Sequence, residues 1–216
     1  MFGLTVCLLG IGLILGISEI LWQKKVLKGE SQRKFVHLVG GTFAAFWPWL
    51  ISWRTIQALG IALLAGVLFN RYKKFSHFQD GARRKSYGDI FSALAIILAA
   101  TLTDEPVFYA IAILHLALAD GLAAVIGTKY GRKWRYSVFG QTKTVIGSMT
   151  FWFVSLCILG YGVLFASDVL LHNNYALLLV ALPPALTALE NFAILGFDNI
   201  VIPVAVIVAL NALSGV

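Results

Sequence analysis

Long apolar runs occupy most of this chain of 216 residues and leave few folds open to it. An α-helix needs about 20 mainly apolar residues to cross the hydrocarbon core of a bilayer. A composition of 59% hydrophobic and 12% charged residues is that of a membrane protein. We predict an all-α, polytopic transmembrane bundle of eight spans, with seven as the alternative because two runs are short and the last two are barely separated. The predicted spans cover residues 3–22, 35–53, 55–70, 90–103, 106–127, 145–167, 175–195 and 198–215.

The positive charges gather in alternate loops between these runs. The chain has 17 Lys and Arg residues, and only Arg54 falls outside the first, third and fifth loops. Because Lys and Arg concentrate on the cytoplasmic side of a membrane, we predict a multi-pass protein with its N-terminus outside and the odd-numbered loops in the cytoplasm. The formal net charge of +7 has the same explanation. No basic arm carries interleaved aromatic residues, so we expect no nucleic acid partner.

The chain has the organisation of a single integral membrane domain over residues 1–216, since no linker rich in Pro, Gly or Ser divides it. The first run has no positive charge before it and no small-residue cleavage site, so we expect it to be retained as a helix. Cys7 and Cys157 lie within apolar runs, which argues against a disulfide framework or a zinc site. Any active site must therefore be built from helix ends and short loops.

Unusual polar residues gather at the predicted cytoplasmic ends of the helices. Asp120 lies about two turns inside the fifth span, and Glu190 and Asp198 bracket the last cytoplasmic turn. An ionisable residue at membrane depth costs about 3 kcal/mol and usually faces the bundle interior or a wet cavity. These three carboxylates are therefore functional candidates. The alternative for Asp120 is a structural ion pair with a cation on a neighbouring helix.

The residues around these carboxylates indicate a metal and phosphate. Carboxylates beside Lys, Arg and Thr, in a chain without clustered Cys or His, favour a hard oxygen-ligated ion such as Mg²⁺ over zinc. Glycines such as Gly147 allow backbone amides to approach a phosphate closely. The segment GQTKTVIGS, residues 140–148, lacks the order of a Walker A loop, and we predict no strand before it. Gly127 and Gly131, four residues apart, also suit helix packing.

Five motifs together resemble the CTP-dependent polyprenol kinase family, which includes phytol kinases and dolichol kinases. They are RKFVHLVGG, KSYGDIF, LADGLAAVIGTKYGR, GQTKTVIGS and ENFAILGFDNIVIP, and they follow the family's order between Arg33 and Pro203. The first span, residues 3–22, lies outside the match. The resemblance implies a membrane kinase that transfers the terminal phosphate of a nucleotide, commonly CTP, to the hydroxyl of a lipid alcohol. The chain is most similar to the phytol kinases, so phytol or geranylgeraniol is the expected acceptor.

On this resemblance we assign roles to the polar residues. The predicted catalytic residues are Asp120, Lys143, Glu190 and Asp198, with Asp120 and Asp198 as metal ligands and Glu190 or Asp198 as the base. The predicted nucleotide-binding residues are Arg33, Lys34, His37, Lys129, Arg132, Lys133, Thr142, Thr144, Gly147 and Ser148. The predicted supporting residues are Ser86, Asp89 and Asn199.

Simpler roles stand beside some of these assignments. Arg33 and Lys34 also suit a role as topology determinants, and His37 a role as helix cap or carbonyl partner. The chain reads GRK where the family often has Gly-Lys, so Arg132 and Lys133 both stay candidates for that cation.

Two other functions are also compatible with the sequence. A cytidylyltransferase would leave CMP on the lipid and release pyrophosphate, whereas a kinase releases CDP. A transporter or non-catalytic scaffold would use the intramembrane charges as an ion path. Such charges should line a route across the bilayer, whereas here they cluster on one predicted face.

Overall fold

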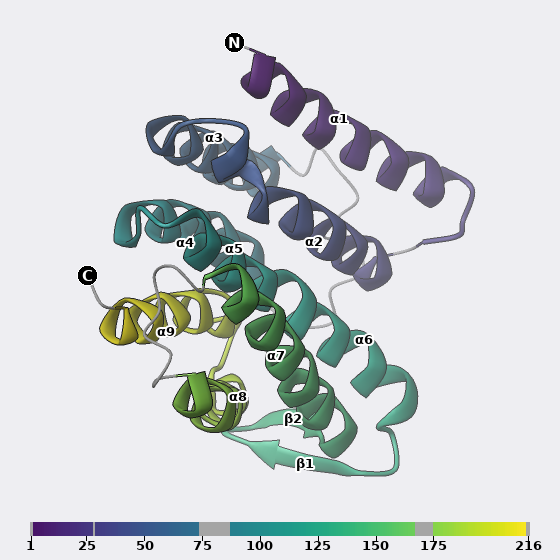
Figure 1. The fold of residues 1–216 in the computed structure, drawn as a ribbon. Helices are drawn as coiled ribbons and strands as arrows, with labels where there is room; N and C mark the ends of the chain where they lie inside the picture. The colour runs from purple at the N-terminus through teal and green to yellow at the C-terminus, as the bar shows by residue number, and fades with distance from the viewer. Residues whose placement is uncertain (1, 28, 74–86, 167–174, 215–216) are drawn as a thin grey trace.

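The computed structural model describes residues 2–27, 29–73, 87–166 and 175–214, and it is a helical bundle with one β-hairpin (Figure 1). The all-α class predicted from the sequence is thereby confirmed. The helices are α1 (Phe2–Gln23), α2 (Glu30–Ala45), η1 (Trp47–Trp49), α3 (Trp53–Lys73), α4 (Gly88–Leu102), α5 (Pro106–Leu114), η3 (His115–Asp120), α6 (Gly121–Tyr130), α7 (Val145–Phe165), α8 (Tyr175–Phe192) and α9 (Asp198–Leu213).

Five helical segments are long and apolar enough to cross a membrane. They are α1, the continuous segment Pro106–Tyr130, α3, α7 and α8. Two further helices, α4 and α9, are apolar but have only 15 and 16 residues. The count of seven or eight spans therefore stays a prediction.

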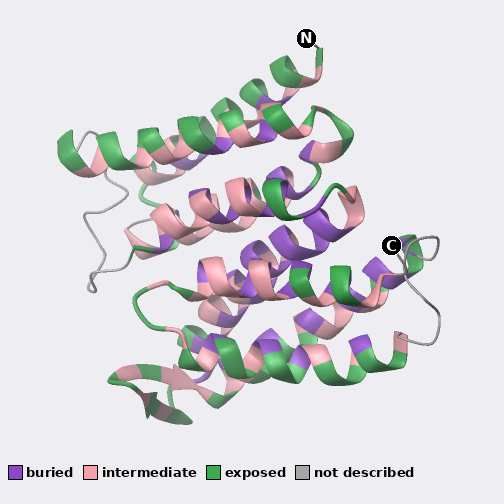
Figure 2. Ribbon diagram, turned by 90° about the vertical axis from the view of Figure 1, so that its left-hand side faces the viewer, coloured by how far each residue is buried: buried purple, intermediate pink, exposed green. Residues whose placement is uncertain are grey.

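The segment Pro106–Tyr130 is the centre of the bundle. It consists of α5, the π-helix η3 and α6, and its parts contact α2, α4, α7 and α9. Tyr109, Phe108 and Ile113 on α5 are fully buried, as Figure 2 shows for much of this central segment. In contrast α1 lies at one side of the bundle, packs on α2 and leaves most of its surface exposed. The core therefore surrounds the helix that carries Asp120.

The predicted span over residues 35–53 was wrong at both ends. Helix α2 begins earlier, at Glu30, and ends at Ala45, and the short 3₁₀ turn Trp47–Trp49 follows it. Pro48 explains the break, because proline lacks the amide hydrogen that an α-helix needs and its ring clashes with the preceding turn. Polar residues of the first turns of α2 therefore belong to a helix and not to a loop.

The β-hairpin between α6 and α7 was not predicted from the sequence. Strand β1 (Arg135–Val138) pairs antiparallel with β2 (Gln141–Thr144), and Val138 faces Gln141 across the turn. The expectation that no strand precedes the segment 140–148 was therefore wrong, and Lys143 lies on a strand. Four-residue strands rich in charged and hydroxyl side chains lack the apolar alternation by which strands are recognised. The predicted helix start at residue 145 agrees with α7.

Candidate active site

Three carboxylates from distant parts of the sequence meet at one point. Asp120 is the last residue of the π-helix η3, Glu190 lies near the end of α8, and Asp198 begins α9. One oxygen from each carboxylate lies within 4.8 Å of the other two. We call these residues the carboxylate cluster. Three like charges this close repel one another, so the arrangement calls for cations to balance it.

Lys143 supplies one such cation from the β-hairpin. Its Nζ donates a hydrogen bond to the Glu190 carboxylate and another, of 2.9 Å, to the Glu190 backbone carbonyl. The Lys143 side chain is only 15% exposed, and it also interacts electrostatically with Asp120 and Asp198. The ammonium group of Lys143 is nearly buried and faces three carboxylates. A polyphosphate and a metal ion can both be held between these charges.

His37 connects α2 to the carboxylate cluster. Its Nε2 lies 2.8 Å from the backbone carbonyl of Leu116 and 3.5 Å from Oδ2 of Asp120. Its Nδ1 lies 3.5 Å from the Ser92 hydroxyl, which itself donates to the Gly88 carbonyl. The predicted role as carbonyl partner is therefore observed, and the same imidazole also lies beside Asp120.

Lys34 and Arg33 lie one turn before His37 on α2. The Lys34 side chain is 15% exposed, lies 4.0 Å from Glu30 and interacts electrostatically with Asp120. Its burial lowers the pKa of the Lys34 amine. Arg33 forms a bidentate pair with Glu30, at 3.1 Å from Nε and 2.6 Å from the terminal nitrogen. Both cations therefore interact with the cluster through Asp120, and Arg33 is in addition held by Glu30 of its own helix.

The residues around the start of α7 have structural partners. Thr144 caps α7 by accepting a 3.0 Å hydrogen bond from the Gly147 amide. A Cβ on Gly127 would lie 2.7 Å from the Thr144 hydroxyl and 3.0 Å from the Gly147 Cα, so both glycines permit close packing of α6 on α7. Thr142 is exposed on β2. The packing role that the sequence left open for Gly127 is thus observed.

Ser148 lies in a polar triad that the sequence did not predict as a group. The Tyr136 hydroxyl donates to the Asn191 side-chain oxygen at 2.7 Å, Ser148 donates to the same oxygen at 3.0 Å, and the two hydroxyls are 2.5 Å apart. Only Ser148 was predicted. Asn191 directly follows Glu190 and lies within the motif ENFAILGFDNIVIP, but the sequence analysis assigns it no role.

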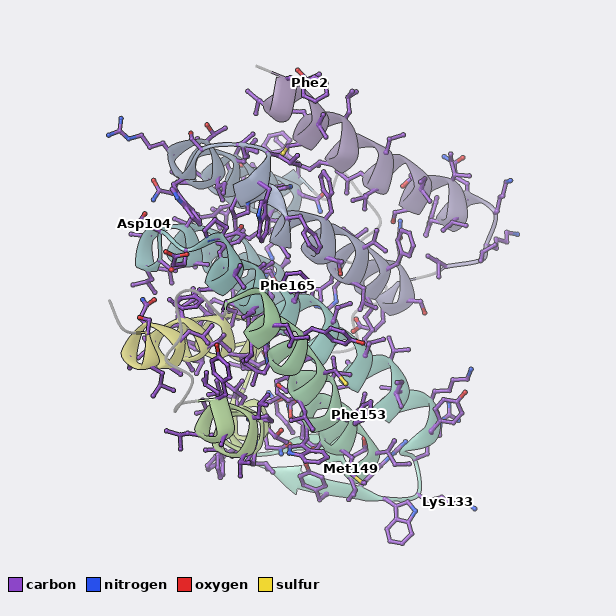
Figure 3. All side chains as sticks on the ribbon, viewed as in Figure 1. Phe2, Asp104, Lys133, Met149, Phe153 and Phe165 are labelled. Atoms are coloured by element: carbon purple, nitrogen blue, oxygen red, sulfur yellow. The ribbon has the colours of Figure 1, made fainter. Side chains whose placement is uncertain are left out.

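Several predicted residues are not brought to the carboxylate cluster. Lys129, Arg132 and Lys133 are exposed at the end of α6 and in the turn after it, and Figure 3 shows Lys133 at the outer edge of the molecule. Asp89 forms a bidentate ion pair with Arg71. Ser86 lies outside the described residues.

The donor set of the cluster fits a hard divalent cation. Carboxylate oxygens from Asp120, Glu190 and Asp198 are the ligands that Mg²⁺ prefers, and an octahedral ion usually takes a few of them together with water and phosphate. Asn199, which follows Asp198, is buried and donates its amide to the Gly196 carbonyl. Its side-chain oxygen has no hydrogen-bond partner among the described residues, so a further neutral oxygen lies one residue from the cluster.

A comparison with known proteins assigns the chain to a family. No family model matches it, and no solved structure does. It is 32% identical over 203 residues to a phytol kinase of Synechocystis sp., and the alignment covers 89% of this chain and 83% of that protein. The family predicted from the five motifs is thereby confirmed, and the chain belongs to the phytol kinase-like polyprenol kinases.

Proposed function

We propose that this protein is a membrane kinase that transfers the terminal phosphate of CTP to the hydroxyl of a prenyl alcohol, phytol or geranylgeraniol. The observation that carries the proposal is the carboxylate cluster with Lys143 against it, in a chain whose relative is a phytol kinase. The preference for CTP and for these two alcohols rests on the family resemblance.

The reaction forms a bond between the alcohol oxygen and the γ-phosphorus and breaks the bond between that phosphorus and the β–γ bridging oxygen. The products are the phosphorylated alcohol and CDP. A kinase contributes positioning and charge neutralisation to such a transfer and little covalent chemistry. The side chains near the cluster suit this task, since Lys143 and Lys34 are cations that are both largely buried.

The charged residues then share the tasks of the transfer. Lys143 binds the β- and γ-phosphates, and Lys34 with His37 binds the remaining phosphate oxygens from the α2 side. Asp120 and Asp198 would hold Mg²⁺, which when bound neutralises phosphate oxygens and polarises the phosphorus. The alcohol proton goes to a carboxylate of the cluster, and Glu190 and Asp198 are the two candidates for this base.

The same proposal includes the orientation of the protein. The alternation of charged loops supports an orientation with the carboxylate cluster on the cytoplasmic face and the N-terminus outside. Nucleotide is then available to the cluster from the cytoplasm. A prenyl alcohol in the bilayer presents its hydroxyl at head-group depth, where a helix-end site can reach it.

A transfer assay tests the function directly. Purified protein in detergent is given Mg²⁺, γ-labelled CTP or ATP, and one of phytol, geranylgeraniol, farnesol, dolichol or diacylglycerol. We expect label in phytol or geranylgeraniol from CTP, with CDP as the second product. Release of pyrophosphate with CMP on a lipid would replace the kinase by a cytidylyltransferase. Absence of both products from folded protein would favour the transporter or scaffold.

A further inference from the structure

Five exposed apolar side chains lie between Glu190 and Asp198 in the chain or on the hairpin that carries Lys143. They are Phe139, Phe192, Ile194, Leu195 and Phe197, with exposed fractions of 74%, 60%, 40%, 46% and 48%. We call them the apolar rim. Phe192 is the last residue of α8, and three others, Ile194, Leu195 and Phe197, lie in the short connection from α8 to α9, residues 193–197.

The connection between α8 and α9 has an unusual composition for its place. Residues 192–197, the last residue of α8 and the loop after it, read FAILGF, without one charged or hydrogen-bonding side chain, although the loop joins two helices at the predicted cytoplasmic face. Loops on a protein surface normally carry polar side chains. A helix end and loop that together expose four large apolar groups between two carboxylates are suited to an apolar ligand whose polar end reaches those carboxylates.

Phe139 brings the β-hairpin to the same place. It stands at the hairpin turn, and its ring centroid lies 6.2 Å from that of Phe192 (the turn end of the hairpin lies beside α8 in Figure 1). Lys143 on the same hairpin contacts Glu190, two residues before Phe192. The hairpin thus presents a cation to the cluster and an aromatic ring to the rim.

Two rim residues have a backbone conformation that indicates a role for their side chains other than in folding. Phe139 has φ +46° and Leu195 has φ +56°, a left-handed conformation that bulky residues rarely adopt and that Asn or Gly adopts readily. In the described part of the chain the one other non-glycine residue with positive φ is Lys25. Asn or Gly would serve the two turns better than Phe or Leu.

The rim is also held firmly in position. The Leu195 carbonyl accepts a 3.0 Å hydrogen bond from the Tyr87 amide at the start of α4. The ring of Phe197 packs on that of Phe91 in α4, with 4.6 Å between centroids. The exposure of the rim is therefore a property of an anchored loop.

We propose that the apolar rim binds the isoprenoid chain of the alcohol substrate at the units next to its hydroxyl. The proposal rests on the proposed function, because that function requires an alcohol oxygen at the carboxylate cluster. A chain attached to that oxygen needs an apolar surface nearby, and four of the rim residues lie between Glu190 and Asp198 in the sequence. The rim then selects alcohols with a branched hydrocarbon chain.

Substitutions that improve the turns test the proposal kinetically. Phe139→Asn and Leu195→Asn place a turn-favouring residue at a positive φ, so a purely structural role predicts unchanged or improved folding and activity. Binding by the rim predicts that each raises the KM for phytol about tenfold, while kcat and the KM for CTP stay within about twofold. Lys25→Asn is the matched control, since it changes a positive-φ residue away from the cluster. An unchanged KM for phytol in both rim variants would overturn the proposal.

A binding measurement separates failure of the rim from failure of the proposed function. The full-length protein is irradiated with a phytol analogue that carries a diazirine on its second isoprene unit, and labelled peptides are identified by mass spectrometry. We expect label in residues 192–197 that is lost with excess phytol. Label that excess phytol leaves in place, or absence of label there, would overturn the proposed binding at the rim. Label that excess phytol removes, in a protein without kinase turnover, would support binding at the apolar rim and contradict the proposed kinase function.

Discussion

Lys143 donates hydrogen bonds to both the side chain and the backbone carbonyl of Glu190, 47 residues further along the chain. This double contact joins β2 to the end of α8 and fixes the ammonium group beside the carboxylate cluster. An ion pair with one exposed partner contributes little, but both partners here are largely buried. The geometry therefore suits a cation that must be in place before the phosphate arrives.

Replacing Lys143 should reduce turnover strongly. We expect Lys143→Ala to lower kcat for phosphoryl transfer by about 100-fold, because a positioned cation would no longer meet the charge that develops on the phosphate. Lys24→Ala, at an exposed lysine after α1, is the matched control and should keep wild-type kcat. The measurement is steady-state transfer to phytol. A kcat for Lys143→Ala within about threefold of wild type would remove this residue from the reaction.

Replacing Asp120 should separate activity from stability. We expect Asp120→Asn to lower kcat/KM by about 1000-fold, while the midpoint of thermal unfolding stays equal or rises, because one of three mutually repelling charges is removed. Asp104→Asn, an exposed carboxylate distant from the hairpin in Figure 3, should alter neither quantity. Both quantities are measured on detergent-purified protein. A large fall in the midpoint with retained specific activity would indicate the structural ion pair instead.

Removal of metal should abolish the reaction reversibly. We expect chelation of Mg²⁺ to stop transfer and its return to restore it, and Asp198→Asn to raise the Mg²⁺ concentration for half-maximal activity about tenfold. The measurement is a Mg²⁺ titration at saturating CTP. If Asp198→Asn reduces kcat without moving that concentration, Asp198 acts as the base and not as a metal ligand.

The polar triad should act through the position of Glu190. We expect Tyr136→Phe to lower kcat about fivefold, the effect of one lost hydrogen bond of about 1 kcal/mol, with the KM for phytol unchanged. Ser148→Ala should cost a similar factor, and the double variant less than the product of the two because both hydroxyls share Asn191. Kinetics of the three variants check this. Strictly multiplicative losses would argue that the two hydroxyls act separately.

The predicted orientation can be tested by chemical labelling. In a background with Cys7→Ala and Cys157→Ala, an impermeant maleimide added to intact cells should label Asp104→Cys and leave Lys133→Cys unlabelled until the membrane is opened. Figure 3 places these two positions at opposite ends of the molecule. The reverse pattern would put the carboxylate cluster outside and contradict the proposed access of nucleotide.

Much of the site was accessible from the sequence because burial of charge in a membrane is costly. Asp120, Glu190 and Asp198 stood out as carboxylates at the ends of apolar runs, and the structure brings them together. Their separation in sequence was no obstacle, since the topology places alternate helix ends on one face. Their roles stay predictions.

Other features of the site depend on contacts that no local sequence pattern predicts. The β-hairpin has strands too short and too polar to show alternation, so the sequence placed Lys143 at a helix entry. Glu30 holds Arg33, and only the early start of α2 brings the two within reach. Lys129 and Lys133 looked like phosphate ligands because they follow Asp120 in the chain, yet the helix that joins them carries them to the surface.

The π-helix His115–Asp120 determines which change in the length of the central segment the carboxylate geometry tolerates. A π turn accommodates one residue more than the same stretch of α-helix, and each α-helical residue turns the chain by about 100°. Shortening this stretch by one residue, for example at Leu118, would restore regular α-helical winding and leave Asp120 directed toward its partners on α8 and α9. The same deletion within α5 would instead rotate Asp120 by about 100° away from them, so relatives would be expected to tolerate a one-residue difference in the π-helix and not in α5.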